Sequence, residues 1–150
     1  MSWVSITIAD LKDAKVSALV EACRTAALGA GQADPVPNII ANVATRIRAE
    51  ISGCAGNVLD VDTAKIPADL KGLACRMIMR EAMSRLQQPL TEDEREEQRN
   101  DLRYLERIAK CEIPVASTDT PAVSEVQHGL AIQQASTPTR TATRTKLAGL

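Results

Sequence analysis

Residues 36–51 carry the clearest pattern in the chain, a helical repeat of apolar side chains. The apolar positions recur at intervals of three and four, and they are Val36, Ile39, Ile40, Val43, Ile47 and Ile51. This spacing places them on one face of an α-helix. Asp34 and Pro35 are typical of a helix start, and Gly53 is typical of a helix end. The pattern therefore predicts an amphipathic helix over Val36–Ser52 with its apolar face in a core.

Residues 68–88 predict a second long helix, which begins after Pro67 and ends before Pro89. It carries two apolar stripes instead of one. The first stripe is Leu70, Leu73, Ala74, Met77, Ile78 and Ala82, and the second is Cys75, Met79, Met83 and Leu86. Two apolar faces require contacts on two sides, so this helix is either the centre of the bundle or is shared with a partner subunit. Met79 and Met83 are therefore candidates for a partner interface.

Two weaker helical signals come earlier in the chain. Thr7-Ile8-Ala9-Asp10 resembles a capping box with Asp in place of Glu, and it predicts a short helix through Leu11. Residues 16–28 repeat apolar side chains on one face and stop at Gly29. The spacing leaves open whether these segments form one helix or two. Residues 54–67, where two aspartates alternate with apolar residues, predict a surface loop that could include a short strand.

Residues 91–111 predict the last helix, which opens with a full capping box of Thr91 and Glu94. Residues 92–101 contain no apolar side chain, so this half must project into solvent or lie against a polar surface. Four arginines at intervals of four share one side of the helix: Arg95, Arg99, Arg103 and Arg107. They either form salt bridges with nearby glutamates or form a face for a charged partner. Acids outnumber bases by eight to five over residues 91–112, which argues against DNA phosphates as that partner.

The composition changes at Pro114. The 37 residues from there to the end hold seven Thr, three Ser and three Pro, which is typical of an extended or disordered segment. The sequence thus predicts a helical domain over 1–113 and an interaction tail over 114–150. Within the tail, Thr120 and Pro121 could open a short helix. The candidate partner contacts are Val123, Val126 and Leu130 on one face of that helix, and Arg140, Arg144 and Lys146 in a final stretch without acids.

The overall composition limits the fold and the function. Trp3 and Tyr104 are the only aromatic residues, so the core must be aliphatic, which favours an all-α bundle of four to five helices. A net charge of −1 and two aromatic residues argue against binding nucleic acid by bulk charge or by base stacking. No segment is long and apolar enough to span a membrane, and no export signal is recognisable at Met1.

No catalytic, metal or cofactor site is predicted. The four cysteines, at positions 23, 54, 75 and 111, include no CxxC pair, and the chain has one histidine, His128. Without an export signal we expect all four cysteines to be reduced thiols that fill apolar space. No phosphate-binding, dinucleotide-binding, metalloprotease or serine-hydrolase motif occurs. The sequence gives no positive argument for an enzyme.

The order of segments and a few short strings resemble a known family. The strings are residues 8–12 (Ile-Ala-Asp-Leu-Lys), residues 66–71 (Ile-Pro-Ala-Asp-Leu-Lys) and residues 104–113 (Tyr-Leu-Glu-Arg-Ile-Ala-Lys-Cys-Glu-Ile). With the helix Val36–Ser52 between the first two, residues 5–115 resemble the head–tail connector proteins of tailed bacteriophages. These are also called adaptor or head-completion proteins, and the likeness is to the Mu-like branch. The family commonly has Gly after Ile-Ala-Lys, where this chain has Cys111, and often has aromatic residues where the buried helix here has methionines.

The resemblance implies a structural virion protein at the head–tail junction, assembled in the host cytoplasm. Its subunits would form a closed, twelve-fold ring below the portal protein, extend the DNA channel without sequence-specific binding, and offer a surface to the tail or to a second connector. Such proteins are not enzymes and hold no cofactor. The alternatives are a tail terminator or stopper ring component, a small helical DNA-binding regulator and, on the cysteines alone, a thiol enzyme.

Overall fold

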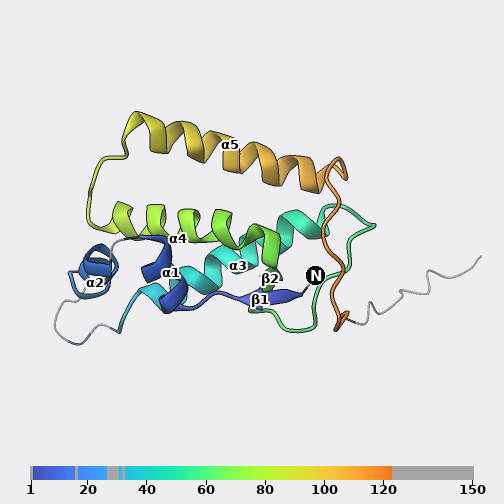
Figure 1. Cartoon of the computed structure of the whole chain (residues 1–150), viewed down its shortest axis with the longest axis horizontal. Helices are drawn as coiled ribbons and strands as arrows, with labels where there is room; N and C mark the ends of the chain where they lie inside the picture. The colour runs from blue at the N-terminus through green and yellow to red at the C-terminus, as the bar shows by residue number, and fades with distance from the viewer. Residues whose placement is uncertain (1, 16, 27–30, 32, 123–150) are drawn as a thin grey trace, which may run out of the picture.

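The computed structural model describes residues 2–15, 17–26, 31 and 33–122. Over these residues the chain forms five α-helices, one 3-10 turn and two short strands (Figure 1). In chain order they are β1 (Trp3–Ser5), α1 (Ile8–Ala14), α2 (Ser17–Thr25), α3 (Val36–Ser52), β2 (Lys65–Pro67), the 3-10 turn η1 (Ala68–Leu70), α4 (Lys71–Arg85) and α5 (Glu92–Ala109). The prediction of a mainly α-helical bundle is confirmed.

Helix α4 is the centre of the bundle. It runs antiparallel to α3 and α5, while α1 and α2 pack against another of its sides (Figure 1). The apolar face of α3 is buried as predicted, with Ile47 and Ile51 fully inaccessible. Cys75 and Met79, from the second stripe of α4, also lie in the core. The second apolar stripe of α4 thus makes its contacts within the same chain. Of the two alternatives for α4, the structure shows the first, in which it is the centre of the bundle.

The N-terminal segments form two helices and one strand. The Thr7 hydroxyl accepts a hydrogen bond from Asp10 N–H and the Asp10 carboxylate accepts one from Thr7 N–H, so the capping box is confirmed. The backbone of Lys15 is extended, which separates α1 from α2. Helix α1 continues three residues beyond the predicted end at Leu11. Strand β1, which the sequence pattern did not predict, pairs antiparallel with β2 and places Trp3 opposite Pro67.

The helix predicted over 68–88 is shorter than expected at both ends. Its first turn is the 3-10 turn η1, and α4 ends at Arg85, followed by Gln87 in a left-handed conformation with φ of 54°. Helix α5 ends at Ala109, two residues before the predicted end at Cys111. These ends differ from the prediction because apolar spacing defines the body of a helix better than its last turn.

Cys111, which follows the C-terminal end of α5, has the backbone conformation of a helix cap. Cys111 N–H donates to the Ile108 carbonyl at 3.0 Å and Glu112 N–H donates to the Arg107 carbonyl at 2.9 Å. These two bonds make a Schellman cap, whose residue after the helix is left-handed and is usually Gly. Cys111 occupies that position with φ of 62°.

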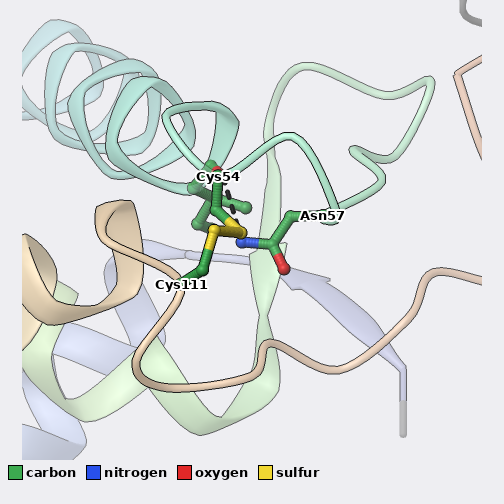
Figure 2. The surroundings of a disulfide bond; sticks show 4 residues. Cys54, Asn57 and Cys111 are labelled. Carbon is green, nitrogen blue, oxygen red and sulfur yellow. Dashed lines mark hydrogen bonds between the residues drawn. A yellow bond between two sulfur atoms is a disulfide. The ribbon is translucent and has the colours of Figure 1, made fainter.

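A disulfide bond joins Cys54 to Cys111 (Figure 2), so the prediction of four reduced thiols is wrong for this pair. Helices α3 and α5 run in the same direction, which brings the residues after their C-terminal ends together across 57 positions of sequence. The Asn57 side-chain amide donates to the Ile51 carbonyl at 3.1 Å and holds the turn that carries Cys54 (Figure 2). Cys23 and Cys75 are free and buried.

We expect that replacing both bridged cysteines by serine lowers the free energy of unfolding by about 2–4 kcal/mol, because the unfolded chain regains the freedom of a long loop. The measurement is urea unfolding of the oxidised protein and of the variant. A matched variant with Cys54→Ser and Cys111→Gly should recover about 1 kcal/mol, because glycine adopts the left-handed position without steric cost. Equal stability of the oxidised protein and the double-serine variant would contradict this role of the bridge.

Candidate interaction surfaces

The four arginines of α5 lie on its solvent side. The ion pairs there are Arg95–Glu92 (3.6 Å), Arg99–Glu92 (3.4 Å) and Arg107–Glu112 (3.1 Å). Each partner is more than half exposed, and such pairs contribute little individually. Arg103 has no ion pair among the described residues. The structure thus shows a solvated, mixed-charge helix face, the first of the two arrangements expected for these arginines.

The inner side of α5 meets α4 through a buried polar layer. Asp101 accepts hydrogen bonds from Arg76 at 2.5 Å and from Arg80, and its side chain is 6% exposed. Glu97 lies 3.3 Å from Arg76 Nε and 3.6 Å from Arg80 Nη1. Burial alone would raise the pKa of Asp101, but the hydrogen bonds from the two arginines outweigh it and lower that pKa. The half of α5 without apolar side chains therefore rests partly on a polar surface.

The polar layer was not predicted, although the sequence contains a signal for it. Arg76 and Arg80 are four residues apart on α4, and Glu97 and Asp101 are four residues apart on α5. Each pair therefore projects from one face of its helix. Two antiparallel helices with such pairs can be linked by matching charges.

A hollow lies on each side of the polar layer. One, of about 480 Å³, is bounded by α3, α4 and α5 and is lined by Leu102, Gln98 and Arg46, among others. The other, of about 360 Å³, is bounded by η1, α4 and α5 and is lined by Tyr104 and Asn100, among others. Leu102 is 38% exposed and Tyr104 is 39% exposed.

Residues 114–122, here called the strap, lie against the domain although the sequence analysis assigns them to the tail. The indole N–H of Trp3 donates to the Ala116 carbonyl at 3.0 Å. Two backbone bonds join the strap to the loop before β2: Val61 N–H to the Thr120 carbonyl at 2.9 Å, and Ala122 N–H to the Leu59 carbonyl at 2.7 Å. The chain after α5 therefore does not leave the bundle at Pro114, and Pro121 lies in a β-bridge with Asp60 instead of opening a helix.

Asp60 fastens the strap through its carboxylate. It accepts hydrogen bonds from the hydroxyls of Thr118 and Thr120, the latter at 2.6 Å, and from Asp62 N–H at 2.8 Å. The threonine hydroxyls are the main reason that the pKa of Asp60 falls from 3.8 to about 2. Asp60 is buried at 2% exposure, so the expected surface loop is wrong at this residue.

Arg48 holds the same loop from the side of α3. Its guanidinium donates to the carbonyls of Asp60 at 2.7 Å, Asp62 at 3.0 Å and Lys65 at 2.9 Å. It also lies over the ring of Trp3, 5.5 Å from the centroid, which is a cation–π distance. Trp3, Arg48 and Asp60 thus connect α3, β1, the loop and the strap.

We expect the contribution of Asp60 to stability to depend on pH. A carboxyl group whose pKa is lowered by folding stabilises the fold above its ordinary pKa, and this contribution is lost as the pH falls toward the lowered value. The difference in free energy of unfolding between wild type and Asp60→Asn should therefore shrink from about pH 4 to about pH 2. Urea unfolding at several pH values, followed by the fluorescence of Trp3, measures it. A difference that stays constant down to pH 2 would contradict the fastening role of the carboxylate.

The remaining candidate residues fall into two groups. Met79 is 2% exposed and lies inside the bundle, and Met83 is half-buried on α4, so only Met83 has accessible surface in the described structure. The other candidates lie outside the described residues, and they are Val123, Val126, Leu130, Arg140, Arg144 and Lys146.

The described residues contain no group of three or more His, Cys, Asp or Glu side chains placed to hold a metal ion. Burial raises the pKa of the Cys23 and Cys75 thiols, which is opposite to what a nucleophilic cysteine requires. None of the helices in the described part is long and apolar enough to cross a bilayer.

No protein-family model, curated protein or solved structure matches the chain.

Proposed function

We propose that the protein is a head–tail connector of a tailed bacteriophage, a structural subunit that forms a ring below the portal protein and extends the DNA channel. The proposal rests on the sequence resemblance over residues 5–115. The observation that supports it best is the end of α5, where Cys111 takes the left-handed position at which the family commonly has Gly. This residue type differs from the family, but the backbone conformation is one that glycine favours.

The surface charges suit a channel through which DNA slides. Strong contacts from unpaired lysines and arginines to phosphates would retard DNA, because each phosphate contact adds affinity. Three of the four exposed arginines on α5 have a carboxylate within 3.6 Å, and the chain has a net charge of −1. The same features disfavour the DNA-binding regulator, which needs a basic surface.

The strap gives the tail a defined starting point. Its contacts with Trp3, Asp60 and Val61 hold residues 114–122 on the domain, so the tail that docks on a partner begins after Ala122. In this proposal residues 123–150 bind the portal, and Arg140, Arg144 and Lys146 meet an acidic rim on it.

We expect that deleting residues 123–150 leaves the thermal midpoint of the domain nearly unchanged and weakens portal binding at least tenfold. A matched deletion of residues 114–150 should also lower the thermal midpoint, because it removes the partners of Asp60 and Trp3. The measurements are thermal unfolding by circular dichroism and binding to the purified portal of the same phage. Full portal affinity without residues 123–150 would move the docking surface onto the helices. Binding of the intact protein to purified tail tube but not to portal would favour the terminator alternative.

A further inference from the structure

The disulfide bond between Cys54 and Cys111 lies directly before the strap. Only two residues separate Cys111 from the start of the strap at Pro114. Cys111 is exposed, whereas Cys54 is buried, so a thiol in solution can reach the bridge from the Cys111 side. Cys23 and Cys75, the other two cysteines of the chain, are buried and free, and they do not compete with such a thiol for the bridge.

The bridge also fixes a turn whose backbone conformation is unfavourable for cysteine. With φ of 62°, Cys111 is left-handed, a conformation that disfavours any residue with a Cβ atom. Two backbone hydrogen bonds, donated by the N–H groups of Cys111 and Glu112, hold this turn on α5, and the covalent link to Cys54 holds it from the side of α3. Without that link we expect the last turn of α5 to open more readily, because opening relieves the unfavourable conformation.

The strap covers apolar residues of the domain. Leu70 and Ile108 belong to the core, and they line the same small space as residues 114–116. That space is about 20 Å³, room for about one water molecule, so the strap and the domain are closely packed. The Trp3 indole N–H donates to the Ala116 carbonyl. Release of the strap would therefore uncover Leu70 and Ile108 and would leave the Trp3 indole without this acceptor.

Hydrogen bonds fasten the far end of the strap. The hydroxyls of Thr118 and Thr120 donate to Asp60, and two backbone bonds join the strap to the loop before β2. Each such bond contributes little net stability, because water replaces it when the strap opens. The strap is thus held by one covalent point just before its start and by several weak contacts along its length.

We propose that the Cys54–Cys111 bridge is a redox switch that fastens and releases the strap. In the oxidised protein the bridge pins the end of α5, and the strap packs on Leu70 and Ile108. In the reduced protein the last turn of α5 and the strap leave the domain, while α3, α4 and the rest of α5 stay folded. The switch acts within one subunit, so it goes beyond the connector function and does not depend on it.

The reductant of this switch is a dithiol. Its first thiolate attacks Sγ of Cys111, forms a mixed disulfide and expels Sγ of Cys54 as a thiolate, which takes up a proton. Its second thiolate attacks the reductant's own sulfur in the mixed disulfide, which closes the reductant's disulfide and expels Cys111 as a thiolate that also takes up a proton. Two electrons pass from the dithiol to the bridge, and the two protons that the dithiol loses end on the two cysteines. Oxidised glutathione reverses the reaction by the same exchange, and it is itself reduced to two thiols.

The single tryptophan of the chain reports the state of the strap. In isotope-labelled protein Trp3 gives one indole N–H signal in a proton–nitrogen correlation spectrum. Dithiothreitol should shift this signal to the position of a solvent-exposed indole, while the amide signals of α3 and α4 keep their dispersion. Oxidised glutathione, added after dithiothreitol is removed, should restore the first position. Alkylation under denaturing conditions, followed by mass spectrometry, verifies four free thiols in the reduced sample and two in the oxidised one.

Two variants calibrate the signal. Deletion of residues 114–150 removes the strap, so its indole signal gives the reference position for a released Trp3. Cys54→Ser combined with Cys111→Ser should show a signal close to that reference without any reductant, and the signal should not respond to dithiothreitol.

Three results would each overturn the proposed switch. An unchanged indole signal in fully reduced protein would show that the strap stays fastened without the bridge. A bridge that resists dithiothreitol in the folded protein would show that Cys111 is not reachable by a thiol. Loss of signal dispersion across α3 and α4 on reduction would show that the bridge holds the whole bundle together and does not act on the strap alone.

Discussion

Asp101→Ala should lower the free energy of unfolding by about 3–5 kcal/mol, the largest effect we expect from one substitution. Asp101 is the carboxylate that both Arg76 and Arg80 reach, and the side chain of Arg80 is only 10% exposed. Without Asp101, Arg80 stays buried, and among the described residues only the more distant Glu97 is an acidic partner for it. Within the same part of the chain its Nη1 already lacks a hydrogen-bond partner. An uncompensated buried charge costs far more than a lost surface pair.

Two controls make this result specific. Asp101→Asn keeps the shape and one acceptor oxygen, so its loss should be smaller than that of Asp101→Ala. Glu96→Ala, on the exposed side of the same helix, should change stability by less than about 0.5 kcal/mol. Urea unfolding at pH 7 measures all three. A loss below about 1 kcal/mol for Asp101→Ala would mean that apolar packing alone holds α5 on the bundle.

Ile47→Ala should cost about 2–5 kcal/mol, because it removes a fully buried side chain and leaves a cavity between the helices. Ile47 lies in the second half of α3, which packs against both α4 and α5. Arg46→Ala, one residue earlier and exposed, is the matched control and should stay within about 0.5 kcal/mol of wild type. Thermal and urea unfolding compare the three proteins, and equal stability of Ile47→Ala and wild type would show that the core lies elsewhere.

The body of the fold could be predicted from local sequence alone. The apolar repeat of α3 predicted both of its ends, and the capping boxes at Thr7 and Thr91 predicted the starts of α1 and α5. These signals are local, since a helix face or a cap is defined within a few residues. The two apolar stripes of α4 do not decide whether this helix is the centre of the bundle or is shared with a partner subunit. Only the positions of α1 and α2 against α4 decide this question.

The features that the sequence did not predict depend on contacts between distant residues. Cys54 and Cys111 meet because α3 and α5 end at the same side of the bundle, and their spacing carries no sign of pairing. Asp60 and Thr118 are 58 residues apart, and β1 is three residues long, too short for an alternating pattern to identify it. The polar layer between α4 and α5 is an intermediate case. Each helix shows a local pair of like charges four residues apart, but only the packing of the two helices brings the opposite charges together.

The strap changes how the C-terminal region should be understood. Composition alone placed 114–150 in one tail, because Thr, Ser and Pro are frequent throughout it. In the structure two of those threonines bind the Asp60 carboxylate, and they serve as side-chain donors within the folded domain. A residue type that is typical of disorder can thus have a structural role when a buried acceptor lies opposite it.

Electron microscopy of the purified protein, alone and mixed with the portal of the same phage, tests the connector proposal most directly. The proposal predicts closed rings with a central channel, or a ring stacked coaxially below the portal once portal is added. Particles that remain single subunits in both samples, with no added density below the portal, would contradict it.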